Sequence, residues 1–152
     1  DAGTTTLEIC KLLKTVDFKV RIITNDIKAA AELIDSPHEV IILGGTVQRN
    51  IGSMYGTQTI EMLQNIRANV SFVGTQAMSI EAGIFAPTME KAKVKQLMMQ
   101  CGQAAYLVVD SSKLNLMEFS KICDLKDFTG VITDNQMSEA HRQLLKKEVN
   151  VI

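Results

Sequence analysis

Short apolar, β-branched runs alternate with segments of helical periodicity along this chain, and that alternation most constrains its fold. The pattern predicts strands at residues 20–24, 40–43, 70–73, 105–109, 130–133 and 149–152. It predicts helices at residues 6–14, 27–34, 57–66, 88–101 and 138–147. Strands and helices in alternation are typical of βαβ units, so we expect an α/β fold with a mostly parallel sheet and helices on both faces.

Three local features add detail to this prediction. Thr5 and Glu8 have the spacing of a capping box at the start of the first helix. The continuous apolar run at 40–43 is typical of a strand covered on both faces. The helix at 88–101 is expected to turn one apolar set inward: Met89, Val94, Leu97, Met98 and Cys101.

Composition narrows the class of protein. A length of 152 residues favours one domain, residues 1–152. The 16 basic and 17 acidic side chains leave a net charge of -1, without the basic excess typical of a free nucleic-acid binder. No apolar run approaches the roughly 20 residues of a membrane span, so no membrane association is expected. The three cysteines and two histidines lack disulfide or metal-ligand spacing, so we expect reduced thiols, no metal and no cofactor.

Polar and small residues follow each predicted strand. In open parallel sheets, ligands bind beyond the carboxyl ends of the strands, so these segments predict a polar crevice. Turn chemistry alone favours the same residue types, which leaves a structural explanation open for any single segment. The segments are Asp1–Thr6, Thr24–Asp26, Gly44–Thr46, Gly74–Gln76, Asp110–Lys113 and Thr133–Asp134.

The opening Gly3-Thr4-Thr5-Thr6, before a helix, has the chemistry of an anion cradle. Glycine allows close approach, and the free N–H groups at a helix start attract anions; a plain helix cap is the alternative. Lys113 is expected to neutralise an anionic ligand, or to be solvated, while Asp110 or Ser111 holds a ligand hydroxyl. Glu90 lies in a first helical turn, and Lys91 and Lys93 are expected to face solvent.

An ordered series of motifs resembles the DeoR family of bacterial transcriptional regulators over essentially the whole chain. The motifs are Asp1-Ala2-Gly3-Thr4-Thr5-Thr6, Thr24-Asn25, Leu43-Gly44-Gly45, Phe72-Val73-Gly74, Gly83-Ile84, Glu90 with Lys95, Asp110-Ser111-Ser112-Lys113 and Val131-Ile132-Thr133-Asp134. The resemblance is to the C-terminal effector-binding domain of these regulators. It implies a Rossmann-like sheet similar to the sugar-phosphate isomerase and CoA-transferase fold.

The resemblance also implies a function: a cytoplasmic repressor domain relieved by a phosphorylated sugar or polyol, acting as a homo-oligomer, a dimer or tetramer. The residues that match the phosphate loop and its cation are Gly3, Thr4, Thr5, Thr6 and Lys113. The residues that match effector-pocket segments are Asp1, Asn25, Gly44, Gly45, Gln76, Glu90, Lys95 and Asp110.

Gln76 departs from the carboxylate that many relatives and the isomerases carry after the glycine. An amide does not ionise and cannot act as a general base, so we expect a sensor rather than an enzyme. Two alternatives remain: a sugar-phosphate isomerase or deaminase with Glu90 as base, and a dimerisation module with a vestigial pocket.

The family's N-terminal winged helix-turn-helix is not part of these 152 residues, so DNA contact is expected only through that further domain. The chain opens inside a predicted strand-to-helix loop. We therefore expect the sheet to lack its first strand, or to fill that edge with something else. The phosphate-site prediction requires Asp1 and Lys113 to lie at one site.

Overall fold

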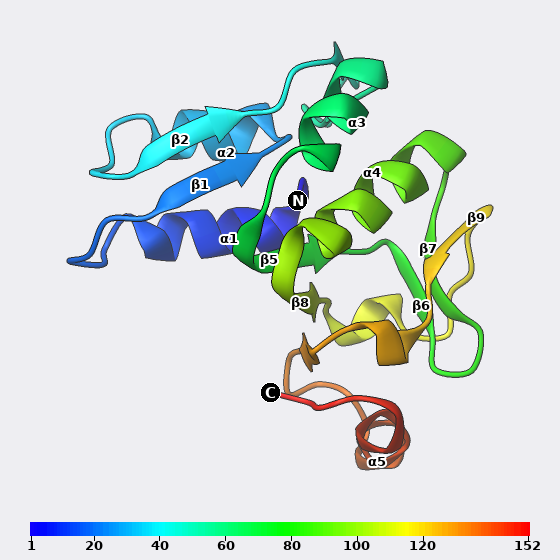
Figure 1. Cartoon of the computed structure of the whole chain (residues 1–152). Helices are drawn as coiled ribbons and strands as arrows, with labels where there is room; N and C mark the ends of the chain where they lie inside the picture. Colours follow the sequence, from blue (N-terminus) through cyan, green and yellow to red (C-terminus); the bar gives the residue numbers. More distant parts are fainter.

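Five parallel strands form the central layer of the computed structural model, which describes all residues 1–152 (Figure 1). One group pairs β1 (Arg21–Thr24) with β2 (Glu39–Ile42). The other has the order β10 (Gly130–Ile132), β8 (Gly102–Val108), β5 (Ala68–Gly74). Each of these strands coincides with a predicted apolar run to within a few residues, because β-branched side chains suit a sheet buried between helices.

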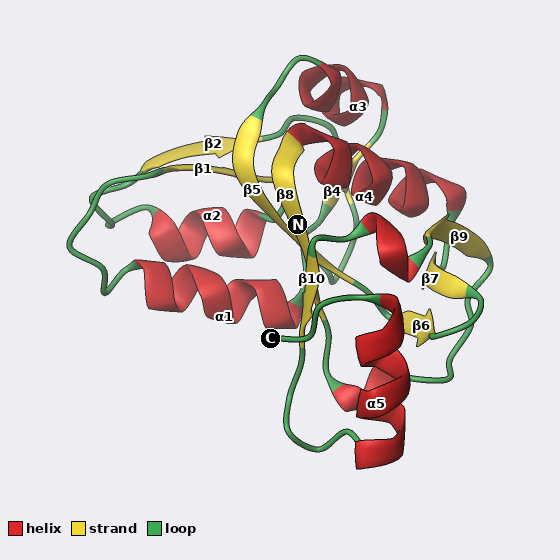
Figure 2. Ribbon diagram, turned by 60° about the horizontal axis from the view of Figure 1, so that its bottom comes forward, coloured by secondary structure: helices red, strands yellow, loops and turns green.

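Helices cover both faces of this layer, as predicted (Figure 2). On one side lie α1 (Thr4–Leu13) and α2 (Ile27–Leu33); on the other lie α3 (Thr57–Gln64) and α4 (Met89–Cys101). The helix α5 (Glu139–Glu148) packs near the C-terminus, and its Leu145 is fully buried. None of the helices has the length and apolar composition that crossing a bilayer requires.

Several short antiparallel elements were not predicted. The hairpin of β3 (Thr46–Val47) and β4 (Met54–Tyr55) follows β2, and β6 (Ala77–Ser79), β7 (Gly83–Ala86) and β9 (Ser120–Cys123) form a second small sheet. Two 3-10 turns, Ser111–Lys113 and Leu125–Asp127, complete the fold. The strand expected at 149–152 is reduced to one bridge between Val131 and Val151.

Three local predictions were wrong. Gly3 occupies the N-cap of α1 and no side chain caps that helix, so the Thr5–Glu8 capping box does not form. Ile42 is 42% exposed because β2 is an outer strand rather than one covered on both faces. Met89 is 68% exposed at the start of α4, whereas the other four members of its predicted inner set are buried.

Candidate functional site

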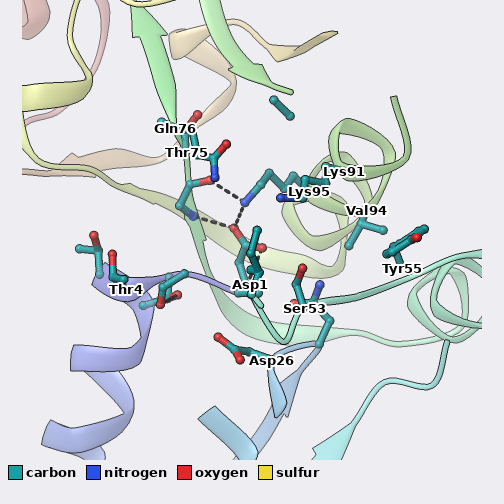
Figure 3. A pocket seen from close by; sticks show the side chains of 18 of the residues that line it. Asp1, Thr4, Asp26, Ser53, Tyr55, Thr75, Gln76, Lys91, Val94 and Lys95 are labelled. Atoms are coloured by element: carbon teal, nitrogen blue, oxygen red, sulfur yellow. Dashed lines mark hydrogen bonds and ion pairs between the residues drawn. The ribbon is translucent and has the colours of Figure 1, made fainter. Parts of the chain in front are cut away.

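A cavity of about 420 Å³ lies at the carboxyl ends of β1 and β5, where the first turn of α1, the β3–β4 hairpin and α4 converge (Figure 3). This is the edge at which parallel α/β sheets bind ligands. Its volume falls within the range of pockets that hold small metabolites. Asp1 and Lys113 both line it, so the structure meets the condition set for the phosphate-site prediction.

The start of α1 presents unpaired backbone donors to this cavity. The first backbone hydrogen bond of the helix runs from Leu7 N to Gly3 O, at 3.0 Å. The N–H groups of Thr4, Thr5 and Thr6 precede it and have no carbonyl partner within the helix. Thr6 donates its hydroxyl to Gly3 O at 3.0 Å, which leaves the Thr4 and Thr5 hydroxyls available. The arrangement provides several donors aimed at one anion.

A buried ion pair joins Asp1, which precedes α1, to Lys95 of α4. Asp1 Oδ2 accepts hydrogen bonds from Lys95 Nζ and from Gly74 N, the latter at 2.8 Å. Lys95 Nζ also donates to Gly74 O at 2.9 Å. An ammonium has three donors, so one N–H of Lys95 remains for a ligand. Burial lowers the pKa of Lys95 to about 8.

Four lysines but only two acids line the cavity. The lysines are Lys28, Lys91, Lys95 and Lys113, and the acids are Asp1 and Asp26. Lys91 was predicted to face solvent, but it lies one helical turn before Lys95 on the cavity side, and burial together with the Lys95 charge lowers its pKa. Lys93 is exposed, as predicted. The Asp1–Lys95 pair is neutral as a unit, and the other three lysines outnumber the one remaining acid, Asp26. The lining therefore carries an excess of positive charge, which favours an anion.

Asn25 supplies a buried acceptor at the opposite wall. Its side-chain amide donates to Met54 O at 2.9 Å, while its Oδ1 is buried without a hydrogen-bond partner. A buried acceptor left unpaired costs about 1–3 kcal/mol. Gln76 also lines the cavity, and its side-chain amide makes no hydrogen bond within the chain.

The β3–β4 hairpin forms a wall that the strand-end pattern did not reveal. It is fastened to the end of β1 by two backbone bonds: Met54 N to Asn25 O at 2.7 Å, and Ile27 N to Gly52 O at 3.0 Å. Ser53 and Tyr55 bring a hydroxyl each to the cavity. Two-residue strands carry too little periodicity to be recognised in a sequence.

Four predicted pocket residues do not line the cavity. Gly44 and Gly45 instead pack against α3: Gly44 O accepts from the Thr59 hydroxyl, and a Cβ on Gly45 would lie 2.4 Å from Tyr55 O. Asp110 Oδ1 accepts from Ser112 N at 2.9 Å and caps the following 3-10 turn. Glu90 is exposed in the first turn of α4, where hydrogen bonds to its own backbone N–H and to the Thr88 hydroxyl lower its pKa.

Other reactive groups lie outside this site. The thiols of Cys10, Cys101 and Cys123 are free, and burial raises the pKa of each. No cluster of three histidine, cysteine, aspartate or glutamate side chains is arranged to hold a metal ion.

Comparison with known proteins agrees with the resemblance in the sequence. The family model "DeoR C terminal sensor domain" matches residues 1–135. "HTH-type transcriptional regulator GlpR" of Haloferax volcanii is 30% identical over 94% of this chain and 56% of its own length. "HTH-type transcriptional repressor GlcR" of Bacillus subtilis is 32% identical over 97% of this chain and 56% of its own length.

A third relative, "Uncharacterized HTH-type transcriptional regulator FruR" of Bacillus subtilis, is 33% identical over 88% of this chain and 53% of its own length. The chain thus spans about half the length of these curated relatives. The family match and the relatives point the same way. The chain belongs to the DeoR C-terminal sensor domain family, and the relatives named here are transcriptional regulators.

Proposed function

We propose that this domain is the sensor of a transcriptional repressor and that its inducer is a phosphorylated sugar or polyol bound in the 420 Å³ cavity. The observation that carries the proposal is the pairing of an uncapped helix start with an excess of lysines around one space. The phosphate would lie against the N–H groups of Thr4 to Thr6, with Lys113 and Lys28 nearby.

The polyol part of the inducer is supported by the opposite wall. Asn25 and Gln76 line the cavity there, and the free Gln76 amide offers both a donor and an acceptor. A chain of hydroxyls attached to a phosphate would match both ends of the cavity.

An enzyme on the same fold is less well supported by this geometry. Glu90, the base expected for an isomerase or deaminase, is exposed and does not line the cavity. Of the two carboxylates that line it, Asp1 is paired with Lys95 and Asp26 caps α2 through Lys28 N. We therefore propose that this chain shares a Rossmann-like fold with the sugar-phosphate isomerases but not their chemistry.

The switch itself requires differential affinity. An inducer changes the behaviour of the whole repressor only if it binds one conformation more tightly than another. We propose that the domain acts in a homo-oligomer, a dimer or tetramer, and that DNA is contacted by a region outside these 152 residues. A dimerisation module with a vestigial pocket is the competing proposal.

A thermal-shift panel of hexose, pentose and polyol phosphates tests the binding step. Ligand at about 100 times its Kd should raise the free energy of unfolding by roughly 2.7 kcal/mol. The unphosphorylated sugars should produce no shift at equal concentration. If no phosphate ester stabilises the domain while sedimentation shows an oligomer, the dimerisation module replaces our proposal.

Lys113→Ala and Lys14→Ala form a matched pair for locating the phosphate. Their side chains are 36% and 39% exposed, and each lies beside a carboxylate, but only Lys113 lines the cavity. Loss of a charged hydrogen bond costs about 1.5–3 kcal/mol, so Lys113→Ala should weaken binding roughly tenfold to hundredfold. Lys14→Ala should leave the affinity unchanged. Equal affinities in the two variants would remove Lys113 from the site, and turnover abolished by Glu90→Gln would favour the enzyme.

A further inference from the structure

Lys91 of α4 occupies a position that disfavours a cation in three ways. It is the third residue of the helix, where the positive end of the helix dipole repels positive charge. It lies one turn before Lys95, and like charges at this spacing destabilise a helix. It is partly buried and forms no ion pair within the chain, and burial together with the Lys95 charge lowers its pKa. The folded chain therefore places a positive charge where its own electrostatics oppose it.

The nearby acids do not compensate this charge. Glu90 is exposed, and hydrogen bonds at the start of α4 hold its carboxylate and lower its pKa. Asp1 is paired with Lys95. Asp26 caps α2 and lies on the far side of Asp1 from Lys91 (Figure 3). A lysine that lines a cavity without a counter-charge indicates that the counter-charge comes from a bound anion.

The start of α1 and Lys91 reach the cavity from opposite sides. The helices α1 and α4 cover opposite faces of the parallel layer (Figure 2). In the close view, Thr4 and Lys91 lie on opposite sides of Asp1 (Figure 3). Both residues line the same cavity. A single phosphate held by the N–H groups of Thr4 to Thr6 would therefore leave Lys91 without a counter-charge.

The rest of the cavity suits hydroxyl groups. The Gln76 amide and the Tyr55 hydroxyl line it and make no hydrogen bond within the chain. Lys95 donates to Asp1 and to Gly74 O, which leaves one of its three N–H groups for a ligand. The volume of about 420 Å³ leaves room for a hydroxylated carbon chain between the start of α1 and Lys91.

We propose that Lys91 forms a second anion subsite and that the ligand of this cavity carries an anionic group at each end. A phosphate lies at the start of α1, and a second phosphate or a carboxylate lies at Lys91. This narrows the inducer to sugar or polyol bisphosphates and phosphorylated sugar acids, and it rests on the proposed function. A monophosphate fills the first subsite only, so it binds more weakly than a ligand that fills both.

Calorimetric titration with three open-chain ligands of equal length tests the second subsite. Glucitol 6-phosphate, 6-phosphogluconate and glucitol 1,6-bisphosphate share one phosphate and carry a hydroxyl, a carboxylate or a phosphate at the other end. At least one of the two doubly anionic ligands should bind about tenfold to a hundredfold more tightly than glucitol 6-phosphate, because it gains a hydrogen bond to a charged group. The tighter of the two identifies the group held by Lys91. Equal affinities of all three would overturn the inference but leave the proposed function intact.

Lys91→Met and Lys93→Met form a matched pair for this measurement. Each variant removes one positive charge from the first half of α4, but only Lys91 lines the cavity, and Lys93 is exposed. Lys91→Met should abolish the advantage of the doubly anionic ligand and leave the affinity for glucitol 6-phosphate nearly unchanged. Lys93→Met should preserve the advantage. Loss of the advantage in both variants, or in neither, would overturn the inference.

Inorganic phosphate tests the two subsites independently of the carbon chain. In a titration followed by amide chemical shifts, the amides of Thr4 to Thr6 and those around Lys91 should respond separately. Lys91→Met should remove the response around residue 91 and keep the response at the start of α1. A response at the start of α1 alone would overturn the second subsite and support the proposed function. No response at either place would overturn both.

Discussion

The two groups of parallel strands, with the helices packed on them, differ in how much core they contain. The part built on β5, β8, β10 and α4 has a continuous core of 21 buried apolar residues. The part built on α1, α2, β1 and β2 has a separate cluster of three: Cys10, Ala29 and Leu33. Since burial of apolar surface is the main source of stability, the N-terminal part should depend on whatever joins it to the larger one.

The ligand cavity spans this same division. The α1 donors, Asn25 and Lys28 belong to the thinly packed part, whereas Gln76, Lys91, Lys95 and Lys113 belong to the well-packed part. An anion bound between them would add contacts across the division. Binding of the proposed inducer would therefore be coupled to the relative position of the two parts, which is a suitable basis for a sensor.

Asp1→Ala should have the largest effect on stability, because the Asp1–Lys95 pair crosses the division. The two side chains are 2% and 11% exposed, and removing one partner of a buried pair costs about 3–5 kcal/mol. Chemical denaturation followed by circular dichroism measures the loss. Glu32→Ala is the control, since it breaks the solvent-exposed pair with Lys14 and should cost about 0–1 kcal/mol. Equal costs would show that the buried pair does not hold the parts together.

Leu107→Ala and Leu33→Ala compare the two cores directly. Both side chains are fully buried, the first in the large core and the second in the small cluster. We expect Leu107→Ala to cost about 3–4 kcal/mol and Leu33→Ala about 2 kcal/mol, because the smaller cluster can relax around a cavity. Hydrogen exchange should show that Leu33→Ala loosens residues 1–42 selectively. Uniform loosening of the whole chain by Leu33→Ala would contradict the division.

A second contrast, between the parallel layer and the short antiparallel strands, explains which parts of the fold could be predicted. The strands of the parallel layer are continuous apolar runs, so their pattern is visible in the sequence. The antiparallel strands β6, β7 and β9 are three or four residues long, and β9 pairs with β7 across a wide sequence separation, since Ile84 pairs with Cys123. Their pairing depends on the finished core, which a local pattern does not contain.

The site was predictable to a similar extent. The segments that follow parallel strands include Asn25, Gln76 and Lys113, and all three line the cavity. Lys28 and Tyr55 reach it from a helix and a hairpin, so no strand-end rule identifies them. Asp110 follows a strand but its carboxylate is used by a local turn, because a short acidic side chain readily caps the backbone two residues on.

The smallest predicted effect, taken per pH unit, is a dependence of stability on pH that arises from Lys95. Its pKa is about 8 in the folded chain, below the roughly 10.4 of an unfolded lysine, so between these values the folded state binds fewer protons. Lys95 should therefore contribute a rise in the free energy of unfolding of the unliganded domain with pH in this window, by about 1 kcal/mol per unit. The lowered pKa of Lys91 and the raised pKa of the three thiols also change the stability there, so the contribution of Lys95 is the difference between the wild type and Lys95→Met in denaturation curves from pH 7 to 10.

Affinity for a phosphate ester should change in the opposite direction over the same pH range. The ester is a dianion above about pH 6, and Lys95 loses its charge above pH 8, so binding should be tightest between these values. Lys91 has a lowered pKa and faces the same ligand, which extends the loss of affinity to higher pH. Calorimetric titration at pH 7 and pH 9.5 should show weaker binding at the higher pH, and this difference should shrink in Lys95→Met. If the affinity instead rises with pH, as the stability is expected to do, the ligand binds away from Lys95. It would then also lie away from the boundary between the two parts that the cavity spans.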